Sequence, residues 1–324
     1  MMTITLDELF TSPDHYLHSY DGDTALFVPM DRAAYHRSIF LDGRISAAGA
    51  GSMRLPAAML AGSVPDPAPT CWIFHIAHCG STLLARALDD PSLNLVLREP
   101  LALRQVAINP DASRLAVITA MLSKRYRADA PTIVKANVPV NFLLPEIVAR
   151  DRAARAIFVH YALRDYVLAI LRNDRHRDWL RNVTAQLAPH LDGVSALSDA
   201  ERAAALWSAQ MRAFAAAIAQ LPNARSLDAE IFFADPSTIL KAAALHFEVP
   251  MSDAVIAERV GGALFATYSK NPAVTFDNDA RMARRRLLEE TLADELAQAQ
   301  RWIERSANDP DSAMTAIAEV RLSG

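Results

Sequence analysis

The chain has 324 residues, of which 52% are hydrophobic, so it can bury a sizeable core as one large or two small domains. Its formal net charge of -4 argues against a nucleic-acid partner held by bulk electrostatics. Two cysteines, Cys71 and Cys79, give no disulfide framework and suit a reducing compartment. No apolar run is long enough to span a bilayer, and the first ten residues carry Asp7 and Glu8 without a basic region. We therefore expect a cytoplasmic protein with no signal peptide and no membrane span.

The first part of the chain, residues 1–66, is expected to form a small extension or cap. Residues 25–29 and 38–41 have the apolar pattern of short strands. Residues 63–70 are polar and rich in proline, which is typical of a linker. We therefore place a domain boundary near residue 66, with residues 67–324 as the main domain.

From residue 71 onward, short apolar runs alternate with stretches of helical periodicity. After a strand that begins near Trp72, strands are expected at residues 93–97, 132–135, 156–162 and 224–227. Helices are expected at residues 112–126, 142–150, from about 166, 198–221, 236–247 and 281–307. Such alternation predicts an α/β fold of three layers, with a central parallel sheet covered by helices on both faces.

The most informative stretch is residues 72–88, an apolar strand that leads through Gly80-Ser81-Thr82 into an amphipathic helix. A turn of this kind directs backbone N–H groups and two hydroxyls at the positive end of a helix dipole, which is where proteins bind phosphate. Gly80 allows close approach of the backbone to an anion. The alternative is an ordinary turn in which Ser81 or Thr82 only caps the helix.

The turn is not a Walker A loop, which has Gly, four residues and then Gly-Lys-Ser/Thr. His75 stands at the position of the first glycine and Ser81 at that of the lysine. Because no lysine lies in the turn, a plain ATPase is disfavoured.

Several segments, in this order, resemble the sulfotransferase family, whose members transfer a sulfuryl group from 3′-phosphoadenosine 5′-phosphosulfate (PAPS) to a hydroxyl or amine. The family's 5′-phosphosulfate loop leads from an apolar strand through Pro-Lys/Arg-Ser-Gly-Thr/Ser-Thr into a helix, and residues 77–84 match it around Gly-Ser-Thr-Leu-Leu. Further matches are Glu99-Pro100 and residues 135–145, 156–169 and 227–247. The resemblance covers residues 71–272 and implies the sulfotransferase-like, P-loop-containing fold. It also implies a nucleotide donor, PAPS, a small-molecule acceptor and no metal.

The chain departs from the family pattern at several site positions. His78 stands where the family has a Lys or Arg, and Asn137 where the animal cytosolic enzymes have their catalytic histidine. An imidazole carries charge only when protonated, so the charge at this position depends on pH.

The segment that resembles the family's 3′-phosphate site is also altered. In one alignment Tyr161 and Ala169 replace the Arg and Ser that hold this phosphate. In the other, Arg164-Asp165 matches the family's Arg-Asp pair and Arg172 replaces the Ser. The resemblance makes Arg164 a candidate nucleotide-binding residue.

Sulfuryl transfer is an in-line displacement, so by analogy with phosphoryl transfer cationic and hydrogen-bond donors supply most of the catalysis. The candidate donor-binding residues in the turn are His78, Cys79, Gly80, Ser81, Thr82 and Leu83. His78 and Lys135 are also candidate catalytic residues. The alternative for Lys135 is a solvated lysine at a strand end. Glu99, after the second strand, is the candidate base, because a carboxylate there would lie at the carboxyl edge of the sheet. The alternative for Glu99 is an ion pair with Arg98 or Arg104.

A late basic region contains Lys270 and Arg281. In the family a C-terminal loop with Lys or Arg closes over the 3′-phosphate, so these two residues are candidates for that contact. Arg284, Arg285 and Arg286 can instead be a solvated helix face that pairs with Glu289 and Glu290, and we favour this for Arg285 and Arg286.

Three functions follow from these observations. The first is a sulfotransferase-like enzyme, and the second is a kinase that uses Mg-ATP with Asp228 near the metal. The third is a non-catalytic protein that binds a nucleotide or a partner. The segment before residue 67 either shapes the acceptor pocket or contributes to a homodimer.

Overall fold

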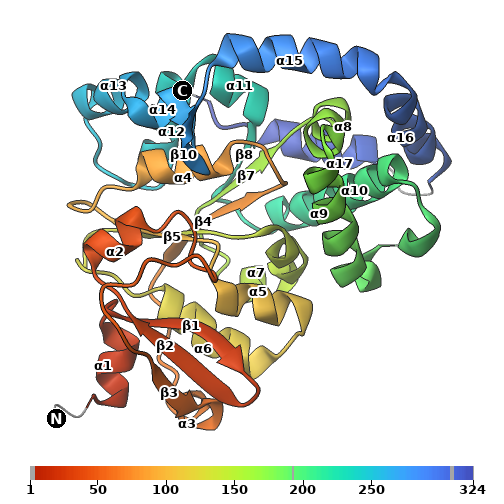
Figure 1. Cartoon of the computed structure of the whole chain (residues 1–324). Helices are drawn as coiled ribbons and strands as arrows, with labels where there is room; N and C mark the ends of the chain where they lie inside the picture. Colours follow the sequence, from red (N-terminus) through yellow and green to blue (C-terminus); the bar gives the residue numbers. More distant parts are fainter. Residues whose placement is uncertain (1–3, 192, 307–309, 324) are drawn as a thin grey trace.

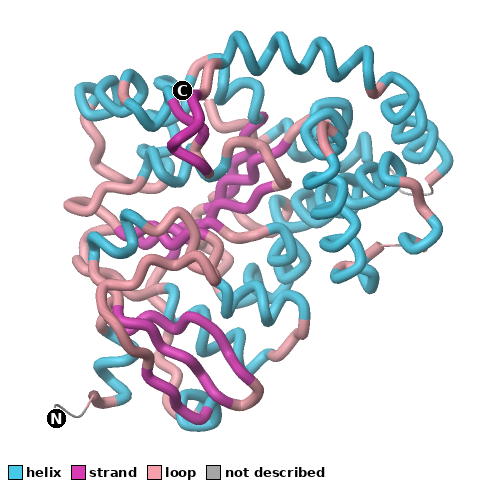
Figure 2. The backbone as a smooth tube through the Cα atoms, viewed as in Figure 1, coloured by secondary structure: helices cyan, strands magenta, loops and turns pink. Residues whose placement is uncertain are grey.

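The computed structural model describes residues 4–191, 193–306 and 310–323. A five-stranded parallel sheet in the order β5-β6-β4-β7-β8 crosses the middle of the molecule (Figures 1 and 2). Its strands are β4 (Thr70–His75), β5 (Leu95–Arg98), β6 (Thr132–Lys135), β7 (Ala156–His160) and β8 (Ala224–Asp228). The expected α/β fold with a central parallel sheet is confirmed, and β6 has the predicted bounds.

Helices cover both faces of this sheet (Figure 1). On one face lie α4 (Ser81–Leu88), α11 (Ala229–Ala234), α12 (Pro236–His246), α13 (Asp253–Gly261) and α14 (Ala263–Ala266). On the other lie α5 (Leu101–Ile108), η1 (Val138–Leu143), α7 (Leu144–Arg150) and α10 (Asp199–Ile218). Beside α10 are α8 (Leu163–Leu171), α9 (Asp174–Gln186), α16 (Ala293–Arg305) and α17 (Pro310–Glu319). Among the described residues, none of the helices is both long and apolar enough to cross a membrane.

The strands are apolar on both sides because helices cover both faces of the sheet. On the α10 face, Trp72 and Phe74 stack with ring centroids 5.5 Å apart, and Phe158 lies 5.3 Å from Phe74. Phe158 in turn contacts Phe214 of α10 at 5.0 Å. The expected core role of Phe214 is confirmed, and Trp207 on the same helix is also buried.

The N-terminal segment has its own three-stranded antiparallel sheet, at the bottom of Figure 1. Its elements are α1 (Leu6–Thr11), β1 (His15–Asp21), β2 (Thr24–Pro29), α2 (Arg32–Arg37), β3 (Met53–Pro56) and α3 (Ala57–Ala61). The strand expected at residues 25–29 is β2. The strand expected at residues 38–41 is wrong, because Ser38 ends α2 and the chain then runs as a loop against β5.

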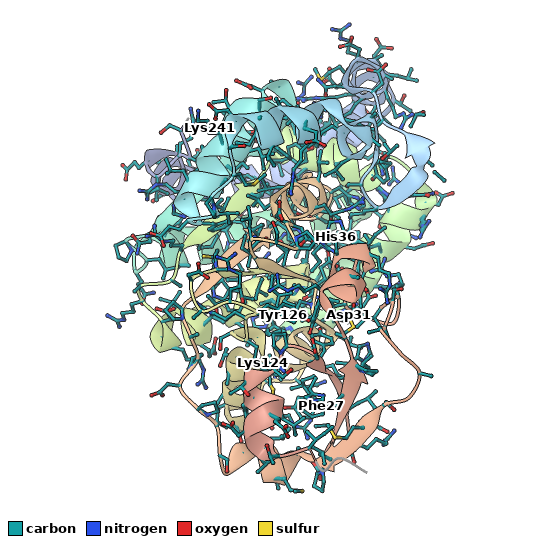
Figure 3. All side chains as sticks on the ribbon, turned by 90° about the vertical axis from the view of Figure 1, so that its left-hand side faces the viewer. Phe27, Asp31, His36, Lys124, Tyr126 and Lys241 are labelled. Carbon is teal, nitrogen blue, oxygen red and sulfur yellow. The ribbon has the colours of Figure 1, made fainter. Side chains whose placement is uncertain are left out.

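Two buried cations fasten this segment to the main sheet. Arg98, at the end of β5, is 1% exposed and donates to the carbonyls of Tyr35, His36 and Ser38 and to Asp89. Lys124 donates to the carbonyls of Leu9 and His15, and lies beside the N-terminal elements in Figure 3. Burial lowers the pKa of Lys124 to about 7.

The C-terminal part differs most from expectation. The single helix expected at residues 281–307 is two helices, α15 (Asn278–Thr291) and α16, because Leu292 leaves helical geometry with φ -107° and ψ 22°. The predicted end at Ala307 lies outside the described residues. Ahead of α15, a short hairpin of β9 (Thr267–Tyr268) and β10 (Asn271–Thr275) lies close to α4 (Figure 1). The helix expected at residues 112–126 is α6 (Ala112–Leu122).

Candidate functional site

The turn between β4 and α4 has an unusual backbone. His78 and Gly80 both adopt positive φ, at 63° and 78°, and Gly80 is the N-cap of α4. The positive φ favours glycine at this position, and a Cβ atom at Gly80 would lie 2.8 Å from Cζ of Phe233, so any other residue would also have to displace that ring. The turn is therefore fixed in a shape that directs the first N–H groups of α4 outward.

Two polar atoms in this turn are buried without a partner. They are Oγ1 of Thr82 and Nδ1 of His78, and neither has a hydrogen bond to any described residue. Buried polar groups are nearly always satisfied, so an unsatisfied pair at the positive end of a helix indicates a place for an anion. The thiol of Cys79, by contrast, is satisfied by the carbonyl of Ile76 at 3.0 Å.

A cavity of about 50 Å³ opens directly on this turn. It is lined by His78, Cys79, Gly80, Ser81, Thr82, Leu83, Phe233, Thr267, Tyr268, Ser269, Lys270 and Phe276. All six turn residues singled out from the sequence therefore line one cavity. Lys270, from the β9–β10 hairpin, joins them.

A second cavity of about 200 Å³ adjoins the first and shares with it His78, Phe233, Tyr268 and Phe276. Its other walls come from the end of β7, from α8, α11 and α15, and from β10. They include Tyr161, Asp165, Ala169, Arg172, Glu230, Asp277, Arg281, Arg284 and Arg285. The two cavities together form one elongated space, which we call the double cavity.

The larger cavity is rich in guanidinium groups. Arg281 forms two 2.8 Å hydrogen bonds with Glu230 and lies 4.4 Å over the ring of Phe233. Arg285 pairs with Asp165 and with Glu230, so it is not the solvated residue that the sequence suggested, although it also approaches Glu289. These two arginines have their charge balanced by carboxylates.

Two further arginines that line this cavity differ from Arg281 and Arg285 in their partners. Within the described parts of the chain, Arg172 and Arg284 form no ion pair with a carboxylate. Arg172 donates to the hydroxyl of Tyr268 at 3.2 Å and to the ring of His176. The cavity therefore retains positive charge for a ligand.

His78 is held as a neutral ring. It stacks on His176 with centroids 3.9 Å apart and meets the edge of Trp179. Burial and the nearby charges of Lys270, His176 and Arg172 hold the pKa of His78 well below its usual value. Its Nδ1 or Nε2 can exchange a hydrogen bond with a ligand, but the ring does not supply a positive charge near neutral pH.

Glu99 and Lys135 form an ion pair at the neighbouring strand ends. The Lys135 ammonium lies 2.5 Å from Oε1 of Glu99 and 2.9 Å from Nε2 of His75, and Lys135 has no exposed surface. The Glu99 side chain is 18% exposed and its backbone has a positive φ of 56°. Burial raises the pKa of Glu99, but the charges of Lys135, His75 and Lys270 outweigh it and bring the pKa to about 2. The partner of Glu99 is therefore Lys135, and neither Arg98 nor Arg104.

A loop of the N-terminal segment lies beside Glu99. The N–H of Leu41 donates to the carbonyl of Arg98 at 2.7 Å, and its own carbonyl accepts from Leu101 at 3.2 Å. The next residues place the Asp42 and Arg44 side chains close enough for Glu99 to influence the pKa of each. Arg44 is anchored by Asp42 and stacks 3.9 Å over Phe40, yet it is 61% exposed.

The structure brings the turn residues, Lys270 and Arg281 to the double cavity, whereas Glu99 and Lys135 lie at the neighbouring strand ends and line neither cavity. Arg164 lines neither cavity and pairs with Glu289 at 2.8 Å. Asp228 also lies outside both and caps α11. Asn137 is buried, with an unpaired Oδ1, two residues beyond Lys135.

Sequence reasoning missed the aromatic walls formed by Phe233, Tyr268 and Phe276, and missed His176. These residues lie outside the matched motifs or come from short elements. Of the segments that carry these residues, only the turn-like stretch around Lys270 was recognisable in the sequence as part of a site. No group of three or more His, Cys, Asp or Glu side chains with metal-site geometry occurs among residues 4–191, 193–306 and 310–323.

Comparisons with known proteins give structural likeness only. No family model and no curated protein matches the sequence. A sulfotransferase from Alicyclobacillus acidocaldarius has 15% identity and a TM-score of 0.39, with 76% of this chain and 99% of that chain covered. A sulfotransferase domain from the curacin biosynthetic pathway has 13% identity and a TM-score of 0.42, with 78% and 97% covered. Both are described as sulfotransferases, the family that the sequence motifs resemble.

Proposed function

We propose that this protein is a sulfotransferase that uses PAPS as donor and a small molecule with a hydroxyl or amine as acceptor. The observation that carries the proposal is the double cavity, which begins at the unpaired Thr82 Oγ1 and His78 Nδ1 and ends among arginines. A donor with anionic groups on both the 5′ and the 3′ position of its ribose matches this distribution of charge.

The 5′-phosphosulfate would bind in the smaller cavity. The N–H groups at the start of α4 and the hydroxyls of Ser81 and Thr82 are its donors. The purine would lie in the larger cavity against Phe233, Tyr268 or Phe276, since aromatic rings favour stacking. The 3′-phosphate would contact Arg172, Arg284 and the Tyr161 hydroxyl, which take over from the family's Arg and Ser.

The acceptor would approach Glu99. A carboxylate with a pKa of about 2 is a weak base, so we assign it first a positioning role, in which it accepts a hydrogen bond from the acceptor hydroxyl. As the acceptor oxygen bonds to sulfur and the sulfur–oxygen bond to phosphate breaks, the hydroxyl proton passes to Glu99. Lys135 has no surface for a ligand, so its role is to hold Glu99 ionised and in place.

We further assign the acceptor side of the site to the N-terminal segment. Asp42 and Arg44 lie near Glu99, and Arg44 is exposed while its guanidinium is held by Asp42. Because Asp42 balances the charge of Arg44, this pair offers hydrogen-bonding groups to a polar acceptor and no net positive charge.

The first test is calorimetric binding of adenosine 3′,5′-bisphosphate, the expected product, with ATP plus Mg²⁺ as the comparison. Binding of the bisphosphate without metal supports the proposal, and binding of Mg-ATP alone would favour a kinase. Transfer from sulfur-labelled PAPS to a panel of hydroxyl and amine compounds then tests the activity. The Glu99→Gln variant, once its thermal unfolding shows that it is folded at the assay temperature, should bind the bisphosphate as wild type does and lose at least about 100-fold in turnover. Binding of the bisphosphate without transfer to any compound, or to water, would favour the non-catalytic alternative.

A further inference from the structure

The anion-binding turn has no cation of its own. Residues 77–83 contain neither Lys nor Arg, and the ring of His78 stacks on His176, with its pKa held well below the usual value. Lys135 is committed to Glu99 and His75 and has no exposed surface. A site for a group that carries negative charge would otherwise depend on N–H and hydroxyl groups alone.

The β9–β10 hairpin brings a cation to this place from far along the chain. Lys270 lies at the hairpin turn and lines the smaller cavity together with residues 78–83, but it does not line the larger cavity. Its ammonium forms no ion pair with any carboxylate in the described segments. Its charge acts on His78, Cys79, Lys135 and Glu99, all of which have pKa values shifted in part by Lys270.

Two arginines hold the hairpin against the turn. Arg86, one helical turn beyond Thr82 on α4, donates to the carbonyl of Ser269 at 2.9 Å. Arg172 donates to the hydroxyl of Tyr268 at 3.2 Å. The two residues that precede Lys270 are therefore anchored to α4 and to the end of α8, which fixes the position from which the lysine reaches the cavity.

We propose that Lys270 is the cation of the 5′ anion site. The β9–β10 hairpin of the same chain brings it to the turn, and Arg86 is its positioning residue. This assignment rests on the proposed function and differs from the sequence-based expectation, in which Lys270 contacts the 3′-phosphate. The larger cavity has Arg172 and Arg284 for that end. The charge that the family resemblance places on the turn itself is thus supplied by a separate element.

The test compares binding of adenosine 5′-monophosphate and adenosine 3′-monophosphate by calorimetry. Lys270→Met should weaken 5′-monophosphate binding about tenfold or more and leave 3′-monophosphate binding within twofold, because a charged hydrogen bond is lost at one end only. Arg284→Met should show the opposite preference. Lys270→Arg should restore most of the lost affinity, since it keeps the charge.

Lys241→Met is the matched control, because Lys241 is also an exposed lysine, 63% exposed, and pairs with Asp253 on the surface of α12 (Figure 3). It should change neither affinity. Arg86→Met, whose side chain does not line the double cavity, should weaken only 5′-monophosphate binding, and by less than Lys270→Met.

Equal weakening of both monophosphates, or weakening of the 3′-monophosphate alone, would overturn the assignment of Lys270. If wild type binds neither monophosphate nor adenosine 3′,5′-bisphosphate, the proposed function fails, and inorganic pyrophosphate then tests the anion site by itself. Pyrophosphate binding that is lost in Lys270→Met would keep the lysine assignment without the nucleotide. If pyrophosphate does not bind either, the assignment of Lys270 fails together with the proposed function.

Discussion

The two polar regions at the carboxyl edge of the sheet are built in opposite ways. At the start of α4, buried polar atoms of Thr82 and His78 have no partner. At the ends of β5 and β6, the charges of Glu99 and Lys135 are directed at each other, and His75 adds a further contact. The first region leaves two polar groups unpaired where we propose that an anion binds, while the groups of the second region fix one another. Removal of Lys135 should therefore act mainly on folding, and removal of the unpaired Thr82 hydroxyl mainly on binding.

The largest effect is expected for Lys135→Met, which leaves the Glu99 carboxylate partly buried without its ammonium partner. Loss of one member of such a pair should cost about 3–5 kcal/mol in free energy of unfolding, measured with urea. The double variant Lys135→Met, Glu99→Leu should recover much of that stability. An unfolding midpoint in urea equal to that of wild type would show that the ion pair does not stabilise the fold.

Acid should act on the same region. Burial and the Lys135 charge lower the pKa of His75 from 6.5 to about 3, while Glu99 has a pKa of about 2 against an ordinary value of 4.5. Both groups bind protons more readily when unfolded, so their contribution to stability should be lost as pH falls from 6.5 towards 2. Urea unfolding at a series of pH values measures this. Glu99→Gln should lose less stability than wild type between pH 4.5 and 2, and an equal loss would count against the prediction.

The turn itself can be tested through its glycine. Gly80→Ala combines an unfavourable positive φ with a Cβ only 2.8 Å from the Phe233 ring, so we expect a cost of about 1–3 kcal/mol and weaker nucleotide binding. Gly22→Ala is the control, because Gly22 also has positive φ but no atom within 4 Å of the added methyl group. Thermal unfolding of both variants separates the contact from the conformational cost, and equal destabilisation would show that Phe233 is irrelevant.

The smallest change in stability is expected for Thr82→Val. Its hydroxyl is buried and unpaired, so replacing it should leave the free energy of unfolding unchanged or raise it by up to about 1 kcal/mol. Nucleotide affinity should nevertheless fall several-fold. Thr119→Val provides the contrast, because the Thr119 hydroxyl donates within α6 to Leu115 or Ala116, at 3.0 and 2.9 Å. Thr119→Val should leave nucleotide affinity unchanged. A fall in affinity for this variant as well would show that the effect of Thr82→Val is not specific to the turn.

The strand–turn–helix unit and the parallel sheet could be predicted from the sequence because their signals are local. Apolar runs such as residues 132–135 and the Gly-Ser-Thr turn each lie within one short window. The pairing of Lys135 with Glu99 could not be predicted, since it depends on β5 and β6 lying side by side with Arg98 opposite Lys135. The same holds for the bend at Leu292 and for the hairpin that carries Lys270, which are decided by tertiary packing.

The buried Arg98 limits how this protein can be divided or recombined. Its guanidinium takes three carbonyl acceptors from residues 35–38, and the next residue in the chain is Glu99. A truncated chain that lacks the N-terminal segment would leave that cation buried next to Glu99 with only Asp89 as partner. Grafting the segment of a related protein would require the same carbonyl geometry. A chimaeric protein that tests the proposed acceptor role of this segment should therefore exchange residues 4–66 and the end of β5 together.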